Sequence, residues 1–410
     1  SPEMLAAAVP DGWSDLFFGW KLDIDWQGYV AGLNTKIYGS ATEPGDGFSL
    51  FGCVVMLWLF RGLLVSAAGP TPGYGIQHVL STRNPREAAL ENWWMSIVQL
   101  VPRFLMITGI AVLGVVFFSP QINSMVGEGL AETGRVSFDF EQILPFVIRD
   151  FIPPGLIGIL MAGLLAAFMS TFDSTVNAGA AYIVNDVYKR YISPRAPNRR
   201  YIILSYVSSV LLVAVAIIIG LRIRNINDIT KWITGLLYAG YIAPNILKWH
   251  WWRFNGYGYF AGMIAGVIAA LAFPHLVPWV GKTYALFFLL PISTLASVWV
   301  CLKTPPDDDK VLDEFYLNVR PWGFWKPVYQ RLLATHPDLK RNRNLARDWF
   351  NIANGIVWQL MLMVVPICIV IRKYSTLWIS LAVLAVTSVI MKFAWYDKLG
   401  PGDMYRHADD

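Results

Sequence analysis

Long apolar runs with very few charges are the feature of this sequence that most limits its fold. A helix needs about 20 apolar residues to cross the roughly 30 Å hydrocarbon core of a bilayer. Runs such as LLVAVAIII at 211–219 do not alternate apolar and polar residues, as the strands of an outer-membrane barrel would. The sequence therefore predicts an all-α polytopic membrane protein with about nine transmembrane helices. They are expected at 50–80, 95–118, 153–187, 201–222, 229–252, 257–274, 280–303, 352–371 and 375–395.

The composition agrees with a membrane location. Only 15% of the 410 residues are charged, whereas a soluble protein has about 25%. The 18 Trp and 18 Tyr suit aromatic belts at the two membrane interfaces. A net charge of +5 then reflects membrane topology rather than a nucleic-acid surface, so no nucleic-acid partner is expected.

The distribution of basic residues predicts the orientation. The loop YKRYISPRAPNRR at 188–200 carries five Lys and Arg, which marks it as cytoplasmic. Nine crossings then place the N-terminal segment outside and the C-terminus in the cytoplasm, in the cell inner (plasma) membrane. The predicted parts are an extracytoplasmic segment 1–48, membrane core helices 49–303, a cytoplasmic amphipathic loop 304–350, two transmembrane helices 351–396 and a cytoplasmic tail 397–410.

A polar stripe interrupts the third predicted span, in LAAFMSTFDSTVNAG at 165–179. Ser170, Asp173, Ser174 and Asn177 stand at helical spacing on one face, and a polar face in a span must meet protein or water. Two interpretations stay open. The hydroxyls either bond to backbone carbonyls as packing contacts, or they supply oxygen ligands to a small cation such as Na⁺ beside an intramembrane Asp.

The segment around this stripe, PPGLIGILMAGLLAAFMSTFDSTVNAGAAYIVNDVYKRY at 153–191, resembles the signature helix of the sodium/solute symporter family. That family includes sodium-coupled sugar, proline and pantothenate carriers. The segment YGIQHVLSTRNPREAALEN at 74–92 resembles the inner end of the family's broken substrate helix. The matching positions in the signature helix are Gly155, Gly163, Ala166–Thr171, Asn177 and Asp186–Tyr188.

The resemblance implies a site for the coupling ion, sodium. By position, its ligands are the backbone carbonyl of Ala167 and the hydroxyls of Ser170 and Thr171. Asp173 lies where other members carry Thr, Ala or Asp, and it is included as a further candidate ligand. No other metal and no organic cofactor is expected.

The resemblance also implies a fold, the C-terminal part of a five-plus-five inverted-repeat transporter. The chain starts at SPEMLAAAVPDGW without the first repeat, so we expect an N-terminal half or another chain to supply the missing helices. Unbroken, the span 50–80 would be about 46 Å long. The GPTPG stretch near 69–73 is expected to divide it into two half-helices, although an ordinary helix followed by a loop is the alternative.

Four residues are candidates for binding the solute. Gln99 and Arg103 lie one turn apart within the span 95–118. Trp232 and Thr234 lie in 229–252, which resembles the family's outer-gate helix, and Tyr238 on the same span is a further residue that could close over a solute. The alternatives are that Arg103 pairs with a helix end or snorkels, and that the aromatic residues anchor the span at the interface. Arg61 in the first span has the same two interpretations as Arg103: it either binds the solute, or it pairs with a helix end or snorkels.

The predicted function is a sodium-coupled symporter that moves a small organic solute across the bilayer by alternating access. The alternative is a transport-inactive truncated carrier that serves as a structural or regulatory subunit. The sequence shows no nucleophile elbow and no phosphate loop, so an enzyme is not expected.

Two other segments suggest contacts with the membrane surface. WHWWR at 249–253 has the composition of an aromatic belt with a basic anchor. The apolar face that starts at Val311 and Leu312 is typical of a helix that lies on the membrane surface.

Overall fold

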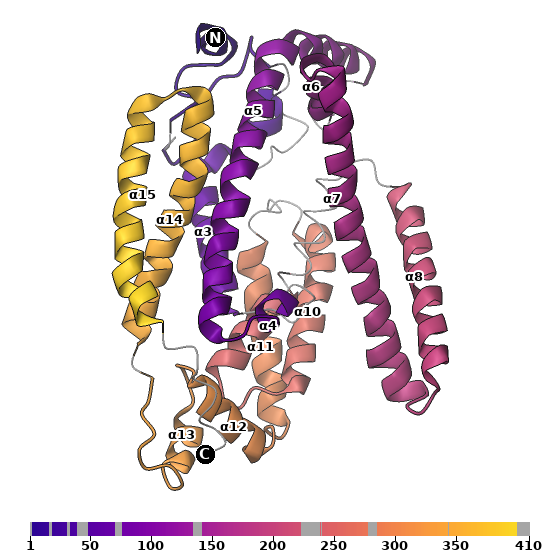
Figure 1. Cartoon of the computed structure of the whole chain (residues 1–410), viewed down its shortest axis with the longest axis vertical. Helices are drawn as coiled ribbons and strands as arrows, with labels where there is room; N and C mark the ends of the chain where they lie inside the picture. The colour runs from indigo at the N-terminus through magenta and orange to yellow at the C-terminus, as the bar shows by residue number, and fades with distance from the viewer. Residues whose placement is uncertain are drawn as a thin grey trace. The chain divides into compact units, whose positions relative to one another are not determined.

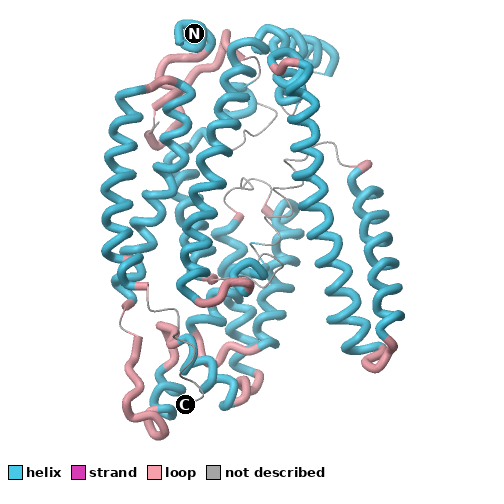
Figure 2. The backbone as a smooth tube through the Cα atoms, in the orientation of Figure 1, coloured by secondary structure: helices cyan, strands magenta, loops and turns pink. Residues whose placement is uncertain are grey.

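The computed structural model describes residues 2–15, 19–30, 33–38, 48–69, 76–133, 142–222, 238, 240–277, 285–342 and 344–399. Every secondary-structure element in these residues is a helix (Figure 2), which confirms the all-α prediction. The helices are α1 (Pro2–Ala8), α2 (Leu33–Tyr38), α3 (Phe51–Ala67), α4 (Ile76–Leu80), α5 (Pro85–Thr133), α6 (Ile143–Phe151), α7 (Pro154–Ala181), α8 (Asn198–Gly220), α10 (Gly256–Leu276), α11 (Leu286–Lys303), α12 (Asp309–Val319), α13 (Lys326–Leu332), α14 (Leu345–Ile371) and α15 (Tyr374–Ala394).

Seven of the described helices are long and apolar enough to cross a membrane, so the chain is a polytopic membrane protein. They correspond to seven of the nine predicted spans. In the first remaining span, 50–80, α3 is a 17-residue apolar helix. In the other, residues 240–250 are helical, whereas 229–237 lie outside the described residues. The seven helices are Pro85–Gln121, Pro154–Ile192, Asn198–Gly220, Gly256–Phe273, Leu286–Lys303, Leu345–Ile371 and Tyr374–Lys398.

Helix α5 is much longer than its apolar run because local capping sets where it begins. The Asn84 side chain accepts a hydrogen bond from the Glu87 backbone N–H at 2.9 Å, and Pro85 takes the first helical position. The helix therefore starts ten residues before the predicted span, and its 49 residues extend about 74 Å. Hydropathy locates the part of a helix that lies in lipid, not its ends.

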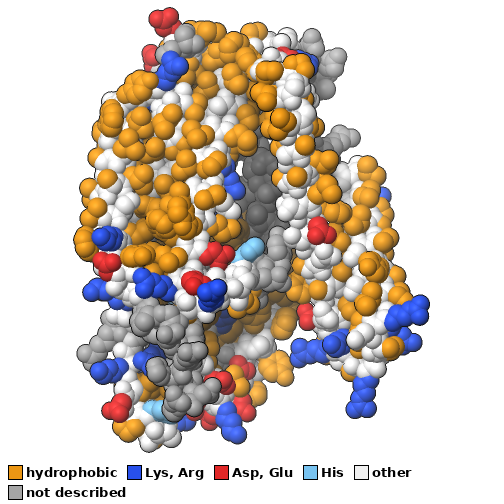
Figure 3. Space-filling view, in the orientation of Figure 1, with side chains coloured by type: hydrophobic (Ala, Val, Ile, Leu, Met, Phe, Trp, Pro, Cys, Tyr) orange, Lys and Arg blue, Asp and Glu red, His pale blue; other side chains and the backbone are white. Residues whose placement is uncertain are grey.

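The described chain forms two compact units. One comprises Ser1–Thr71, Thr82–Val147 and Gly235–Asp410, and the other comprises Pro72–Ser81 and Ile148–Thr234. In the second unit α7 and α8 lie side by side (Figure 1), and α7 continues as a π-helix over Tyr182–Ile192. Lys and Arg side chains gather at the end of this helix pair where the basic loop joins the two helices (Figure 3).

Two glycines allow α10 and α11 to pack closely in the first unit. An added Cβ would lie 2.0 Å from Cys301 Sγ at Gly258 and 1.9 Å from Ser297 Oγ at Gly262. The Ser293 hydroxyl donates to the Gly262 carbonyl at 2.9 Å. The pair of glycines four residues apart therefore lets the two backbones approach closely, which is how small residues support helix packing in a bilayer.

The WHWWR segment at 249–253 makes contacts within the protein that an aromatic belt at the membrane interface would not make. The Trp249 indole N–H donates to the Ala68 carbonyl at 2.9 Å, and His250 Nε2 lies 3.3 Å from the Ala67 carbonyl. His250 Nδ1 lies 3.1 Å from the Trp322 carbonyl. The last carbonyls of a helix lack partners within the helix, so these two side chains cap the end of α3 and join it to the 304–350 loop.

The 304–350 loop packs on itself and on the same helix end. Leu312 and Tyr316 of α12 are buried in a cluster with α13 and Trp325, and the Trp325 indole donates to the Trp249 carbonyl at 2.9 Å. Val311 and Val319 remain exposed. The expectation of a membrane-surface helix is thus incomplete, because the most buried apolar side chains of α12 pack against protein.

The N-terminal segment and the 304–350 loop lie at opposite ends of the first unit. Lys373, just after α14, donates to the Ser14 carbonyl at 3.0 Å and pairs with Asp15 at 3.0 Å. At the other end of α14, Asn342 donates to the Arg320 carbonyl at 3.2 Å. Figure 1 shows the N-terminus at one end and α12 and α13 at the other. This agrees with opposite sides of a membrane, while the inside and outside assignment stays a prediction.

The predicted helix break also stays a prediction. Helix α3 ends at Ala67, Gly69 adopts a positive φ of 66°, and α4 begins at Ile76. Residues 70–75, which include most of GPTPG, lie outside the described residues.

Candidate functional site

The polar stripe lies on α7 and is exposed along its length. Ala167, Ser170, Thr171 and Asp173 are all exposed. Large apolar neighbours on the same helix, such as Ile159, are exposed too. Apolar side chains can face lipid, but a polar face requires protein, water or an ion. The structure therefore presents the predicted sodium ligands on a surface of this chain that lipid alone would not satisfy.

The hydroxyl contacts leave both interpretations of the stripe open. The Thr171 hydroxyl donates to the Ala167 carbonyl at 3.1 Å, a contact within the helix that leaves lone pairs on the hydroxyl oxygen but also engages the carbonyl. The Ser170 hydroxyl has no hydrogen-bond partner among the residues that the structure describes. Two hydroxyl oxygens on adjacent residues, with a carbonyl one turn away, form the kind of oxygen set that a hard cation accepts.

The rest of the stripe is bonded within the helix. The Ser174 and Thr175 hydroxyls donate to the carbonyls of Ser170 and Thr171, each at 2.8 Å. The Asn177 amide donates to Asp173 Oδ1 at 3.0 Å. These contacts, like that of Thr171 with Ala167, match the packing interpretation, whereas the Ser170 hydroxyl makes no such contact among the described residues. Among the described residues, no cluster of three His, Cys, Asp or Glu side chains is placed to hold a metal.

The predicted solute residues are only partly placed. Gln99 and Arg103 lie one turn apart on α5, and both are exposed. Neither has a hydrogen bond or an ion pair within the described ranges. Trp232 and Thr234 lie outside the described residues. The role of all four residues in binding stays a prediction.

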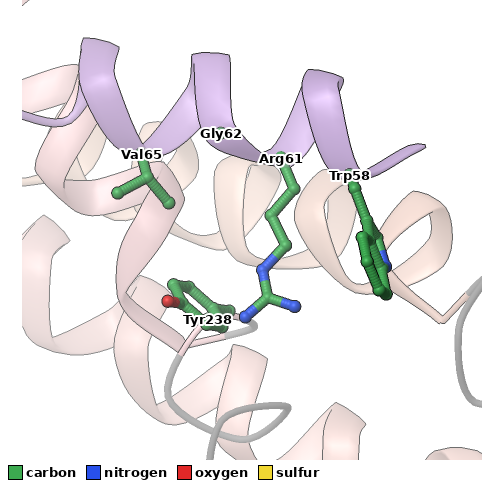
Figure 4. A pocket seen from close by; sticks show the side chains of 5 residues that line it. All are labelled: Trp58, Arg61, Gly62, Val65 and Tyr238. Atoms are coloured by element: carbon green, nitrogen blue, oxygen red, sulfur yellow. The ribbon is translucent and has the colours of Figure 1, made fainter. Parts of the chain in front are cut away.

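A cavity in the first unit is lined by α3 and Tyr238 (Figure 4). Its volume is about 330 Å³, and the Arg61 guanidinium carbon lies 3.7 Å from the centre of the Tyr238 ring. Arg61 is the single charged residue of α3 and lies well inside the helix. The cavity is lined by Trp58, Arg61, Gly62, Val65 and Tyr238.

The sequence indicated Arg61 and Tyr238 separately as possible solute residues, but it did not indicate that they share a cavity. A single Arg in an apolar span was a usable signal, but it could not distinguish a binding residue from one that snorkels. The partner ring of Tyr238 comes from a distant part of the chain, so only the tertiary structure identifies the pair. The capping roles of Trp249 and His250 were missed for the same reason.

Comparisons with known proteins agree with the signature helix. The sequence model described as "Sodium:solute symporter family" matches residues 53–266. A sodium/glucose cotransporter from Vibrio parahaemolyticus is 26% identical over 244 residues, covering 58% of this chain and 44% of the relative. A sodium/proline symporter from Haemophilus influenzae is 25% identical over 192 residues, covering 45% and 38%. A sodium/pantothenate symporter from the same organism is 25% identical over 166 residues, covering 40% and 33%.

The matches cover less than half the length of each of these relatives. All three relatives are named as carriers rather than enzymes. The family match includes nearly all of α3 and the whole of α5, α7 and α8, and therefore both the polar stripe and the residues that line the Arg61 cavity. On this evidence, the chain belongs to the sodium:solute symporter family.

Proposed function

We propose that this chain forms part of a secondary transporter that moves a small organic solute by alternating access, coupled to Na⁺. The observation that carries the proposal is the first turn of the polar stripe on α7. The Ala167 carbonyl and the Ser170 and Thr171 hydroxyls supply sodium ligands, and Asp173 lies one turn away from Ser170 on the same face. The relatives' names support sodium as the coupling ion.

The energy available from sodium suits such a carrier. A monovalent cation that moves inward through about 100 mV releases about 2.3 kcal/mol. Since about 1.4 kcal/mol corresponds to a factor of ten, one ion supports nearly fiftyfold accumulation of solute. Coupling requires that sodium bind the outward-open state more tightly than the inward-open state.

The sodium site is completed by residues outside the polar stripe. One helix face provides at most a few oxygens, and the stripe is exposed in this chain. We propose that helices from an N-terminal half or another chain cover it, as two repeats do in inverted-repeat carriers. The basic loop between α7 and α8 lies in the cytoplasm, the segment before α3 lies outside, and the protein resides in the plasma membrane.

Replacing Ser170 or Thr171 by alanine tests the sodium site. Each variant is expected to bind radioactive sodium about tenfold more weakly, because contacts with a charged group contribute about 1.5–3 kcal/mol. The measurement is equilibrium sodium binding to the protein in its native assembly, reconstituted in vesicles.

Ser205→Ala on α8 is the matched control. The Ser205 hydroxyl donates to the Tyr201 carbonyl at 3.0 Å within its own helix, so its loss should leave sodium affinity unchanged. Unchanged affinity in both the Ser170 and Thr171 variants would show that their hydroxyls only support packing. An absence of sodium binding by the unmodified protein would favour the role of a transport-inactive subunit.

A further inference from the structure

The cavity between α3 and Tyr238 carries a chemical preference. We propose that it binds the carboxylate of an anionic organic solute, with Arg61 as the residue that recognises it. This inference deepens the proposed function by naming the class of solute. It rests on the transporter assignment for its biological meaning, while the binding itself is measured separately.

The charge of Arg61 is costly inside a membrane helix. Helix α3 has the sequence FGCVVMLWLFRGLLVSA, with Arg61 flanked on both sides by apolar residues. A charged group inside a membrane span is costly and normally faces a cavity or a partner. Arg61 lines the cavity and is only partly exposed.

The Arg61 guanidinium contacts an aromatic ring. It lies over the Tyr238 ring at 3.7 Å, a contact in which the ring face attracts the cation. Arg61 has no hydrogen bond and no ion pair to any residue in the described part of the chain. The ring therefore holds the guanidinium in place, and its N–H donors have no oxygen partner among the described residues. A planar guanidinium binds a carboxylate through two parallel hydrogen bonds.

The described part of the cavity wall is otherwise apolar. Trp58, Gly62 and Val65 supply an apolar surface beside Arg61, and no Asp or Glu among the described residues lines the cavity. A Cβ at Gly62 would meet nothing within 4 Å, so the space above it is open. A volume of about 330 Å³ suits a small solute with one charged end and an apolar body.

Carboxylate and neutral probes distinguish this preference. We would measure the thermal shift of the full assembly in detergent with pantothenate, proline, pantothenol and glucose, each with and without sodium. At least one carboxylate probe is expected to stabilise the unmodified protein. The neutral probes are expected to need about tenfold higher concentrations to give the same thermal shift. Arg61→Gln is expected to lose about tenfold or more of the carboxylate affinity, and Arg61→Lys is expected to recover only part of it.

Arg347→Gln is the matched control, since Arg347 lies at the start of α14, pairs with Asp348 at 3.7 Å and does not line the cavity. It should leave the carboxylate shift unchanged. Stabilisation by sodium alone in Arg61→Gln shows that this variant is folded and that the sodium site is independent. Retained carboxylate affinity in Arg61→Gln, or equal shifts with pantothenate and pantothenol, would overturn the inference without affecting sodium coupling. Carboxylate binding without any sodium effect would instead overturn the proposed function.

Discussion

Gly262→Leu is expected to destabilise the first unit by about 3 kcal/mol, the upper end of what overpacking costs. A Cβ at this position would lie 1.9 Å from Ser297 Oγ and 2.9 Å from the Ser293 backbone carbonyl. The side-chain clash can relax by rotation, but the backbone contact cannot. The hydrogen bond from Ser293 to the Gly262 carbonyl would be lost as α10 and α11 separate. The measurement is the midpoint of thermal unfolding in detergent.

Gly158→Leu on α7 is the control for adding a large apolar side chain to a membrane helix. Nothing lies within 4 Å of a Cβ at that position, so its stability should stay level or rise through better helix propensity. A Gly262→Leu protein as stable as the Gly158→Leu protein would show that α10 and α11 do not depend on close backbone contact.

Gly323→Ala is expected to release the 304–350 loop from the end of α3, at a cost of about 2 kcal/mol. Gly323 adopts a φ of +126°, which side chains disfavour, and its Cβ would lie 2.5 Å from the His250 carbonyl. That carbonyl accepts the Phe324 N–H at 2.7 Å, so displacing it also breaks this bond. Limited proteolysis should then cut the α12 and α13 region faster than in the unmodified protein.

Gly355→Ala in α14 is the matched change. No atom lies within 4 Å of its added Cβ, and alanine favours a helix by up to about 1 kcal/mol. Its cleavage rate should equal that of the unmodified protein. Equal protection in Gly323→Ala would mean that the contacts of His250 with Phe324 and Trp322 do not hold the loop.

The membrane segments could be predicted because their signal is local. The apolar runs that became α7, α8 and α14 are long and carry very few charges, which is the signal that a membrane span requires. The helix ends were less predictable. The start of α5 depends on the cap made by Asn84 and Glu87, which lies outside the apolar run.

The candidate site divides in the same way. Ser170, Thr171 and Asp173 share a helix face through spacing alone, so their grouping on α7 follows from the sequence. The sodium binding that we propose there depends on residues that approach that face from elsewhere. The Arg61 cavity could not be predicted without the fold, because Tyr238 reaches α3 only through tertiary packing.

The segments that enter the membrane, and the polar residues that share a helix face, follow from the amino-acid sequence alone. Which helix faces meet depends on the fold, as for Trp249 and Ala68, which are 181 residues apart. The physical reason is that lipid tails are as apolar as the protein side chains that they compete with. Hydropathy therefore cannot distinguish a helix face that packs on another helix from one that faces lipid. Glycines, capping side chains and the Arg61 guanidinium acquire their roles only when a distant segment lies against them.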